Sequence, residues 1–289
     1  MKQLFTLMAA AIFCSAANAQ NDTTITAKKE SDTIRIGNMI IVKKGGGESK
    51  NKYTYIDVER RHRSKPANIS TNWGIVDLGF NNFVDKTDYG NTGGYLYNRP
   101  GAAPLGKNDF DLNTGKSVNV NIWIFMQRFN LIKHHVNLKY GIGLELNNYR
   151  YNSAISYLKS NPFAPAQTPS PVIIRDSISF SKNKLAADYI TVPLMLNFCT
   201  NPGYINKGLS LSVGISAGYL YNQRNKQVSQ ERGKLKTKGG LGVEDFKFSY
   251  IAELGLGPVH LYGSYAPKTI YKTGLDMRPY TFGLRLSNW

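Results

Sequence analysis

Apolar and polar residues alternate strictly along residues 136–146, VNLKYGIGLEL. Every even position in this stretch is apolar, and the positions between them are polar, charged or glycine. A period of two predicts a β-strand with one apolar and one polar face. The stretch is also long enough to cross a bilayer, since a transmembrane strand needs about 9–11 residues. Its polar face carries Lys139 and Glu145 in mid-strand, which is unlike the interior of a soluble β-sandwich.

The same alternation recurs along the chain and predicts eight strands. It is clear again in residues 190–198 and 209–219, and it is least regular in the second strand, where Trp123 and Phe125 are apolar on the otherwise polar face. The strands are expected at about residues 73–84, 116–129, 136–151, 187–199, 209–223, 246–257, 259–270 and 278–289.

The connections between these strands alternate in length. Long polar segments, residues 85–115, 152–184 and 224–245, follow the first, third and fifth strands, and short turns follow the second, fourth and sixth. Prolines in the second long segment argue against a central strand there. Short periplasmic turns and longer extracellular loops are typical of outer-membrane barrels, whose closure satisfies every backbone group in lipid. We therefore predict an all-β fold, an eight-stranded antiparallel transmembrane β-barrel over residues 72–289, with both termini in the periplasm.

Residues 1–19 have the features of a secretory signal peptide. Lys2 supplies the positive charge, residues 4–13 the short apolar core, and Ala17-Asn18-Ala19 the small residues of a cleavage site. Cys14 follows the large Phe13, which argues against a lipoprotein, because the residue before a lipidated cysteine should be small. The mature chain is expected to begin at Gln20.

Residues 20–71 form a polar, basic segment ahead of the barrel. A short strand is expected within residues 32–42, with residues 53–59 as its hairpin partner across the glycines at 45–47. A basic cluster follows at residues 60–65. Two interpretations stay open: a small periplasmic element or plug that contacts lipid or a protein partner, and a partly disordered linker.

The formal net charge of +17 indicates an anionic partner. Nucleic acid is one candidate, but the basic residues are scattered over the N-terminal segment, the loops and the strand ends, without a recognised nucleic-acid module. The phosphates of outer-membrane lipid and lipopolysaccharide attract the same charges. We therefore expect lipid and lipopolysaccharide as partners and no nucleic acid.

Charged residues are also expected inside the barrel. The interior of an eight-stranded barrel is just wide enough to be filled by side chains. These charges could line a narrow solute path, or they could form a neutral network that closes the barrel, because an unpaired buried charge is costly. We favour the network and expect Lys139 and Arg285 to pair with carboxylates. The inward charged candidates are Asp77, Lys139, Glu145, Lys247, Glu253 and Arg285.

The sequence indicates no catalytic residue, cofactor or metal site. His134 and His135 fall in a turn, and His260 is expected near the periplasmic end of the seventh strand. A lipid-modifying enzyme would need a histidine beside a serine at the outer rim. After signal removal, Cys199 is alone and cannot form an intramolecular disulfide. Aromatic residues near strand ends predict interfacial girdles: Trp73, Tyr149, Tyr151, Tyr219, Tyr221, Tyr265 and Tyr280.

Residues 184–198 (KLAADYITVPLMLNF) resemble the signature strand of the PorT-like outer-membrane β-barrel family, and residues 209–221 (LSLSVGISAGYLY) resemble the strand that follows it. The closing residues 280–289 resemble the C-terminal strand that the barrel-assembly machinery reads, through Tyr280, Phe282 and Trp289, although Trp289 is out of register with the outward even positions. The resemblance covers about residues 72–289 and implies a barrel without a defined activity.

Three classes of function follow. The first is a structural or interaction barrel whose extracellular loops contact a partner or lipopolysaccharide. The second is a narrow channel or an accessory component of a transport or protein-secretion apparatus. The third, an outer-membrane lipid-modifying enzyme, has the least support from the sequence.

Overall fold

The computed structural model describes residues 33–36, 39–42, 67–161, 171–202, 208–257 and 259–286. The chain divides into two compact units, Met1–Lys65 and Pro66–Trp289. In the first unit, β1 (Thr33–Ile36) and β2 (Met39–Val42) pair with each other in antiparallel register. Residues 32–42 therefore hold two paired strands where the sequence predicted one. The signal peptide, the expected hairpin partner at 53–59 and the basic cluster at 60–65 lie outside the described residues.

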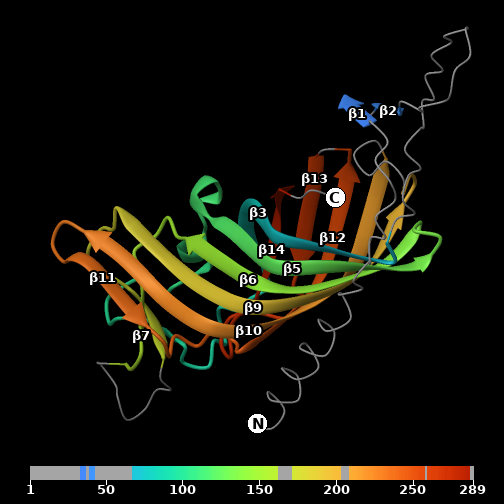
Figure 1. Ribbon diagram of the computed structural model, residues 1–289. Coiled ribbons are helices and arrows are strands. Elements are labelled where there is room, and N and C mark those ends of the chain that lie inside the picture. Colours follow the sequence, from blue (N-terminus) through green and yellow to red (C-terminus); the bar gives the residue numbers. More distant parts are fainter. Residues whose placement is uncertain are drawn as a thin grey trace, which may run out of the picture. The chain divides into compact units, whose positions relative to one another are not determined.

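Eight strands of the second unit form a closed antiparallel ring (Figure 1). Consecutive strands pair with each other, and the last strand pairs with the first. The predicted eight-stranded barrel is confirmed, and closure leaves no open edge in the ring. The strands are β3 (Ile69–Asp85), β5 (Val118–Ile132), β6 (Val136–Arg150), β9 (Lys182–Cys199), β10 (Leu209–Ser229), β12 (Phe246–Leu256), β13 (Val259–Tyr265) and β14 (Met277–Leu286).

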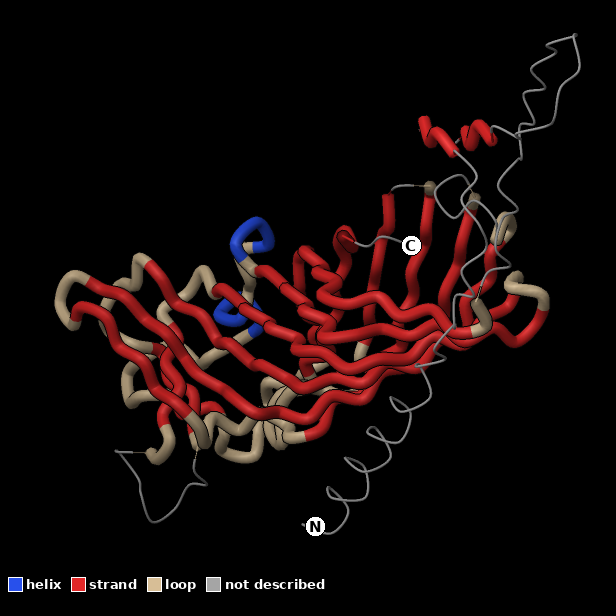
Figure 2. The backbone as a smooth tube through the Cα atoms, viewed as in Figure 1, coloured by secondary structure: helices blue, strands red, loops and turns tan. Residues whose placement is uncertain are grey.

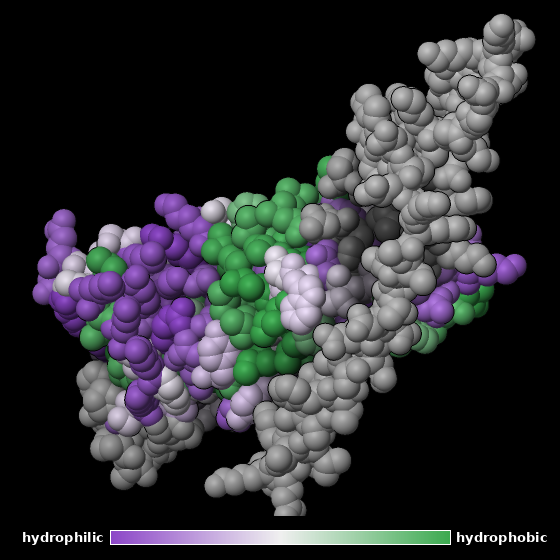
Figure 3. Space-filling model, in the orientation of Figure 1, coloured by the Kyte–Doolittle hydropathy of each residue, from purple (hydrophilic) through white to green (hydrophobic). Residues whose placement is uncertain are grey.

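The alternation in the sequence separates the two faces of the barrel. On β9, even-numbered Ile190 to Phe198 are exposed, and odd-numbered Tyr189 to Asn197 are buried. Figure 3 shows the outward apolar residues as a green band across the barrel. Because the side chains of a strand alternate between its faces, this band, which we call the apolar belt, forms the outer surface of the barrel and the polar residues fill its interior.

A β-bulge explains the irregular second strand. β5 has one extra residue relative to β6 between Trp123 and Phe125. The bulge shifts the alternation, as such insertions do. Trp123 and Met126 are therefore both buried in the barrel, whereas the ring of Phe125 lies 5.7 Å from that of the exposed Trp73.

The long connections meet at one end of the barrel and are partly structured, as the tube in Figure 2 shows. The sequence predicted loops here, and that prediction was incomplete. Three short strands form a second sheet, and β10 continues beyond the belt as a hairpin with β11. Two 3₁₀ turns are also present, and among the described residues no helix could span a membrane. These elements are β4 (Leu96–Tyr97), η1 (Lys107–Phe110), η2 (Thr114–Lys116), β7 (Ile155–Leu158), β8 (Val172–Arg175) and β11 (Gly233–Lys238).

Prolines do not prevent strands in the connection between β6 and β9. Pro171 directly precedes β8, and Pro162, Pro165 and Pro169 lie in residues 162–170, outside the described part of the chain. β7 and β8 pair with each other on either side of that segment. Because the prolines lie outside both strands, the backbone donors of the strands remain available for pairing.

Candidate functional site

The barrel interior contains a network of charged side chains centred on Arg285. Arg285 on β14 donates to both oxygens of Asp77 on β3, from Nε to Oδ1 at 2.7 Å and from Nη2 to Oδ2 at 2.8 Å. Arg285 Nη1 also donates to Glu253 on β12, which forms a second ion pair with Lys139 on β6. All four side chains are almost fully buried. A bidentate arginine–carboxylate pair of this kind is among the stronger polar contacts in proteins.

Lys247 and Glu145 form a second ion pair in the interior, between β12 and β6. Lys247 Nζ also lies 5.1 Å from the ring centroid of Tyr189 on β9. The six charged residues named from the sequence thus all face the interior and all participate in ion pairs. Three are cationic and three are anionic, so the network is neutral overall and no buried charge is left uncompensated.

A chain of asparagine side chains connects the two groups of charges. Asn121 donates to Asp77 at 3.1 Å, Asn119 donates to Asn121 at 3.0 Å and to Asn147 at 2.9 Å, and Asn147 donates to Glu145 at 3.0 Å. These asparagines were not among the residues predicted from the sequence. Their signal was present, because they occupy the polar positions of two alternating strands, where an amide can both donate and accept.

Two aromatic residues complete the interior. Trp123 Nε1 donates to Asp77 at 2.8 Å, and the guanidinium of Arg285 lies 5.5 Å from the Trp123 ring centroid. The Tyr262 hydroxyl donates to Asn119 at 2.5 Å. Beside this network, a cavity of about 30 Å³ remains, bordered by Asp77, Trp123 and Tyr262 among others. That volume holds isolated water molecules at most, and paired polar side chains surround it.

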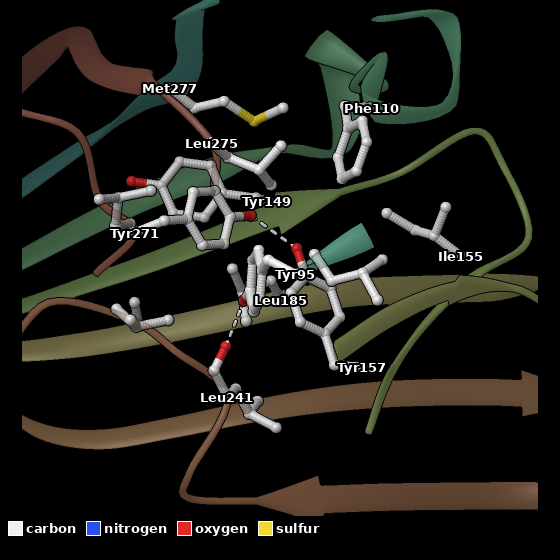
Figure 4. Packing of buried hydrophobic residues seen from close by; sticks show 14 of the residues in the cluster. Tyr95, Phe110, Tyr149, Ile155, Tyr157, Leu185, Leu241, Tyr271, Leu275 and Met277 are labelled. Atoms are coloured by element: carbon white, nitrogen blue, oxygen red, sulfur yellow. Dashed lines mark hydrogen bonds between the residues drawn. The ribbon is translucent and has the colours of Figure 1, made fainter. Parts of the chain in front are cut away.

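Above this polar core, the barrel is filled by apolar and aromatic side chains from the long connections and from the adjoining ends of the barrel strands (Figure 4). The hydroxyls of Tyr151, Tyr157 and Tyr271 are mutually bonded, at 2.6 Å for Tyr151–Tyr157 and Tyr157–Tyr271 and at 3.1 Å for Tyr151–Tyr271. The Tyr95 hydroxyl donates to the Leu241 carbonyl at 2.5 Å. We call this cluster, with β4, β7 and β8 around it, the loop cap. Buried tyrosines usually find a polar partner for the hydroxyl, and three of these tyrosines find it in one another.

The loop cap corrects part of the girdle prediction. Tyr149 and Tyr151 were expected at the membrane interface, but they point into the barrel and are 0% and 4% exposed. Tyr149 occupies an odd, inward-facing position of β6, and Tyr151, directly after the strand, continues the same parity. Trp73, Tyr219 and Tyr221 are exposed on the outer surface, as expected for girdle residues. Tyr265 and Tyr280 are half-buried.

A hollow of about 390 Å³ opens at the rim between β3, η1 and β14. Phe83, Phe110 and Met277 supply apolar surface, while Asp85, whose carboxylate accepts from the Tyr89 hydroxyl at 2.7 Å, supplies a charge. The connections therefore form a defined concave surface at this rim of the barrel.

The remaining predicted residues lie in three places. His260 is buried at the short-turn end of β13, opposite Arg285 and at the other end of the strand from the long connections. The Cys199 backbone oxygen bonds His135 Nδ1 at 2.8 Å beside the β5–β6 turn. In the described residues no group of His, Cys, Asp or Glu side chains could hold a metal ion. Phe282 on β14 is exposed on the outer surface, whereas Trp289 lies outside the described residues.

Residues 67–271 match the family model described as outer membrane protein beta-barrel domain. The chain belongs to this family. As an outer membrane β-barrel domain protein, it has the outward apolar belt that contacts membrane lipid. No curated protein matches the chain. The crystal structure of Ail, the attachment invasion locus protein of Yersinia pestis, is 11% identical, with 74% of this chain and 99% of that chain covered and a TM-score of 0.26. Similarity at that level supports no inference about this chain.

Proposed function

We propose that this protein is a closed outer-membrane barrel with a structural or interaction role, whose structured long loops contact a partner at the cell surface. The observation that supports this most is the filled interior, with the neutral ion-pair network below and the loop cap above. A barrel filled by paired charges and packed tyrosines offers no continuous water path for a solute. The same observation argues against the alternative of a narrow channel. We propose no enzymatic activity.

In the proposed orientation, the loop cap and the β10–β11 hairpin lie outside the cell, and both termini lie in the periplasm. It is supported by the length of the connections, since long extracellular loops and short periplasmic turns are the rule in such barrels. The apolar C-terminal strand, with Phe282 facing outward, suits recognition by the barrel-assembly machinery. The PorT-like resemblance of residues 184–198 adds a role beside a protein-secretion apparatus as a second candidate.

Two experiments test this proposal. In a Cys199→Ser background, a membrane-impermeant thiol reagent should label Glu231→Cys, in the β10–β11 turn, on intact cells. It should label Asn201→Cys, in the β9–β10 turn, only after permeabilisation. The reverse pattern would overturn the orientation. In planar bilayers the purified protein should give no stable conductance steps; reproducible single-channel steps would overturn the closed barrel and favour the channel.

A further inference from the structure

Basic side chains form cross-strand rows on the outer face of the extension that rises above the barrel. Lys226 on β10 is paired directly with Lys184 on β9 and with Lys236 on β11, and Lys184 is paired in turn with Arg150 on β6. The two neighbouring rows add further cations: Arg224 is paired with Lys238, and Val228 is paired with both Lys182 and Lys234. We call this set the basic face: Arg150, Lys182, Lys184, Arg224, Lys226, Lys234, Lys236 and Lys238.

The protein itself neutralises little of this charge. In the described part of the chain, Arg224 is the member of the basic face with an ion pair, from Nη1 to Asp188 Oδ2 at 2.7 Å. Lys184 Nζ bonds the Asn148 side chain, and Arg150 Nη2 donates to the Ser181 carbonyl at 2.5 Å, both of them neutral partners. Like charges placed directly opposite each other destabilise a sheet. The stability of the fold therefore does not explain why these cations face one another across the strands. An anionic ligand that contacts several rows would explain it.

Burial, together with the nearby charges of Lys182 and Arg224, lowers the pKa of Lys184 to about 8. The charges of Lys182 and Lys234, which have the largest effect, also lower the pKa of Lys226. The contributions of neighbouring cations to both pKa values indicate that the cations of the basic face repel one another. A phosphate placed among them would relieve this repulsion.

The order of outward residues along β10 places the basic face relative to the membrane. Leu211, Val213 and Ile215 lie in the apolar belt, Tyr219 and Tyr221 follow at the level typical of an interfacial girdle, and Arg224 comes next. Figure 3 shows hydrophilic residues directly beyond the green band, on the side of the β10–β11 hairpin. The row of Lys184, Lys226 and Lys236 thus continues the outer wall that contacts lipid, at headgroup level, and Lys182 and Lys234 lie beyond it, nearer the β10–β11 turn.

We propose that the basic face binds the phosphate groups of lipopolysaccharide in the outer leaflet. This rests on the proposed orientation and deepens it, because it assigns lipopolysaccharide binding to one set of residues. A row of cations that continues the lipid-facing wall meets the headgroups of neighbouring lipids side-on, with several phosphates in reach of several strands. A soluble acidic partner would meet the loop tips first.

The test compares two triple variants with the same change of net charge. Lys184→Gln/Lys226→Gln/Lys236→Gln removes the three lysines of the row that also contains Arg150, which we call the central row. Lys107→Gln/Lys116→Gln/Lys268→Gln removes lysines from the β3–β5 and β13–β14 connections. Binding of fluorescent lipopolysaccharide to the protein in uncharged detergent is measured at low ionic strength. The central-row variant should bind on the order of 100-fold more weakly. The control should change by less than about threefold. The variant Lys184→Arg/Lys226→Arg/Lys236→Arg keeps the charges and should retain binding. That result would show that the protein folds with substitutions at these three positions.

Three further outcomes decide the proposal. Lipopolysaccharide stripped of its phosphates should bind as weakly as the central-row variant; equal binding with and without phosphates would overturn the proposal. Soluble polyphosphate should compete poorly; complete competition at matched phosphate concentration would point to a free polyanion as the ligand and overturn the assignment to lipid. Labelling of Glu231→Cys on cells tests the orientation separately: an unlabelled hairpin with intact binding in detergent would overturn the orientation but not the chemistry of the basic face.

Discussion

Arg285 and Asp77 lie directly opposite each other on the last and first strands of the barrel and form a bidentate ion pair. The pairing of β14 with β3 is the step that closes the ring, so this ion pair bridges the seam between the two ends of the barrel. Glu253 of β12 binds the third nitrogen of the same guanidinium. A single side chain therefore ties the seam to the rest of the interior network.

Arg285→Gln should destabilise the barrel strongly, because it leaves two buried carboxylates with less cationic compensation. Breaking a buried ion pair by removing one partner costs about 3–5 kcal/mol. Urea unfolding in phospholipid vesicles, followed by heat-dependent gel mobility, measures the loss. Arg278→Gln is the matched control, since Arg278 is on the same strand and binds Asp276 at 2.8 Å, but that pair is much more exposed. Equal losses in the two variants would contradict a special role for the seam.

Gly79→Ala should also weaken the seam, for a steric reason. Gly79 pairs with Gly283 of β14, and a Cβ at Gly79 would collide with the Phe282 carbonyl oxygen and press on the Tyr262 hydroxyl, which lies 2.5 Å from it. The expected loss is about 1–3 kcal/mol, the range typical of overpacking. Gly263→Ala on β13 is the control, because its added Cβ would meet the Thr281 oxygen at an ordinary 3.5 Å. The same unfolding assay applies. A Gly79→Ala barrel as stable as the control would show that the β14 backbone at Phe282 and the Tyr262 side chain both shift at little cost.

The barrel and its inward charges could be predicted because each is local in sequence. Alternation within one strand decides which side chains face lipid, and for Lys139 or Glu145 no knowledge of the partner strand is needed. The even positions of β14 illustrate this, since Phe282, Leu284 and Leu286 all face outward. The bulge in β5 could not be read in this way, because an extra residue is defined only against the register of β6.

The loop cap could not be predicted because its contacts are distant in sequence. Tyr151 bonds Tyr271, which lies 120 residues further along the chain, and the Tyr95 hydroxyl reaches Leu241 over 146 residues. No spacing within one segment encodes such a pair. The basic face could not be predicted for the same reason. Its lysines come from three separate strands, and only the register of β9, β10 and β11 places them in rows.

Tyr157→Phe should loosen the loop cap without opening the barrel. It removes the hydroxyl bonded to both Tyr151 and Tyr271, and one buried hydrogen bond contributes about 1 kcal/mol net. If cleavage follows local opening, trypsin should cut the native protein about fivefold faster at Lys159, which follows β7. Tyr250→Phe, on the outward face of β12, should leave the cleavage rate unchanged. A Tyr157→Phe protein with wild-type cleavage would show that packing alone holds the cap.

Binding of lipopolysaccharide by the basic face should weaken as the pH rises from 7 to 9. Lys184 lies beyond the apolar belt, and its pKa of about 8 means that it is mostly charged at pH 7 and mostly neutral at pH 9. The ligand phosphates are already ionised over this range, since their second pKa is about 6. Loss of one near-surface cation should reduce affinity about fivefold.

Lys184→Arg tests whether Lys184 is the group that titrates, because a guanidinium stays charged at pH 9. Affinity in this variant should fall less between pH 7 and pH 9, with a remaining decrease from Lys226, whose pKa is also lowered. The other charged groups around Lys184 are Arg150, its partner on β6, together with Lys182, Arg224 and Asp188. Asp188 acts in the opposite direction by raising the pKa of Lys184. Lys116→Arg, in another long connection, should keep the full pH dependence. If Lys184→Arg kept the full pH dependence, another group would be the one that titrates, and the low pKa of Lys184 would have no part in ligand binding.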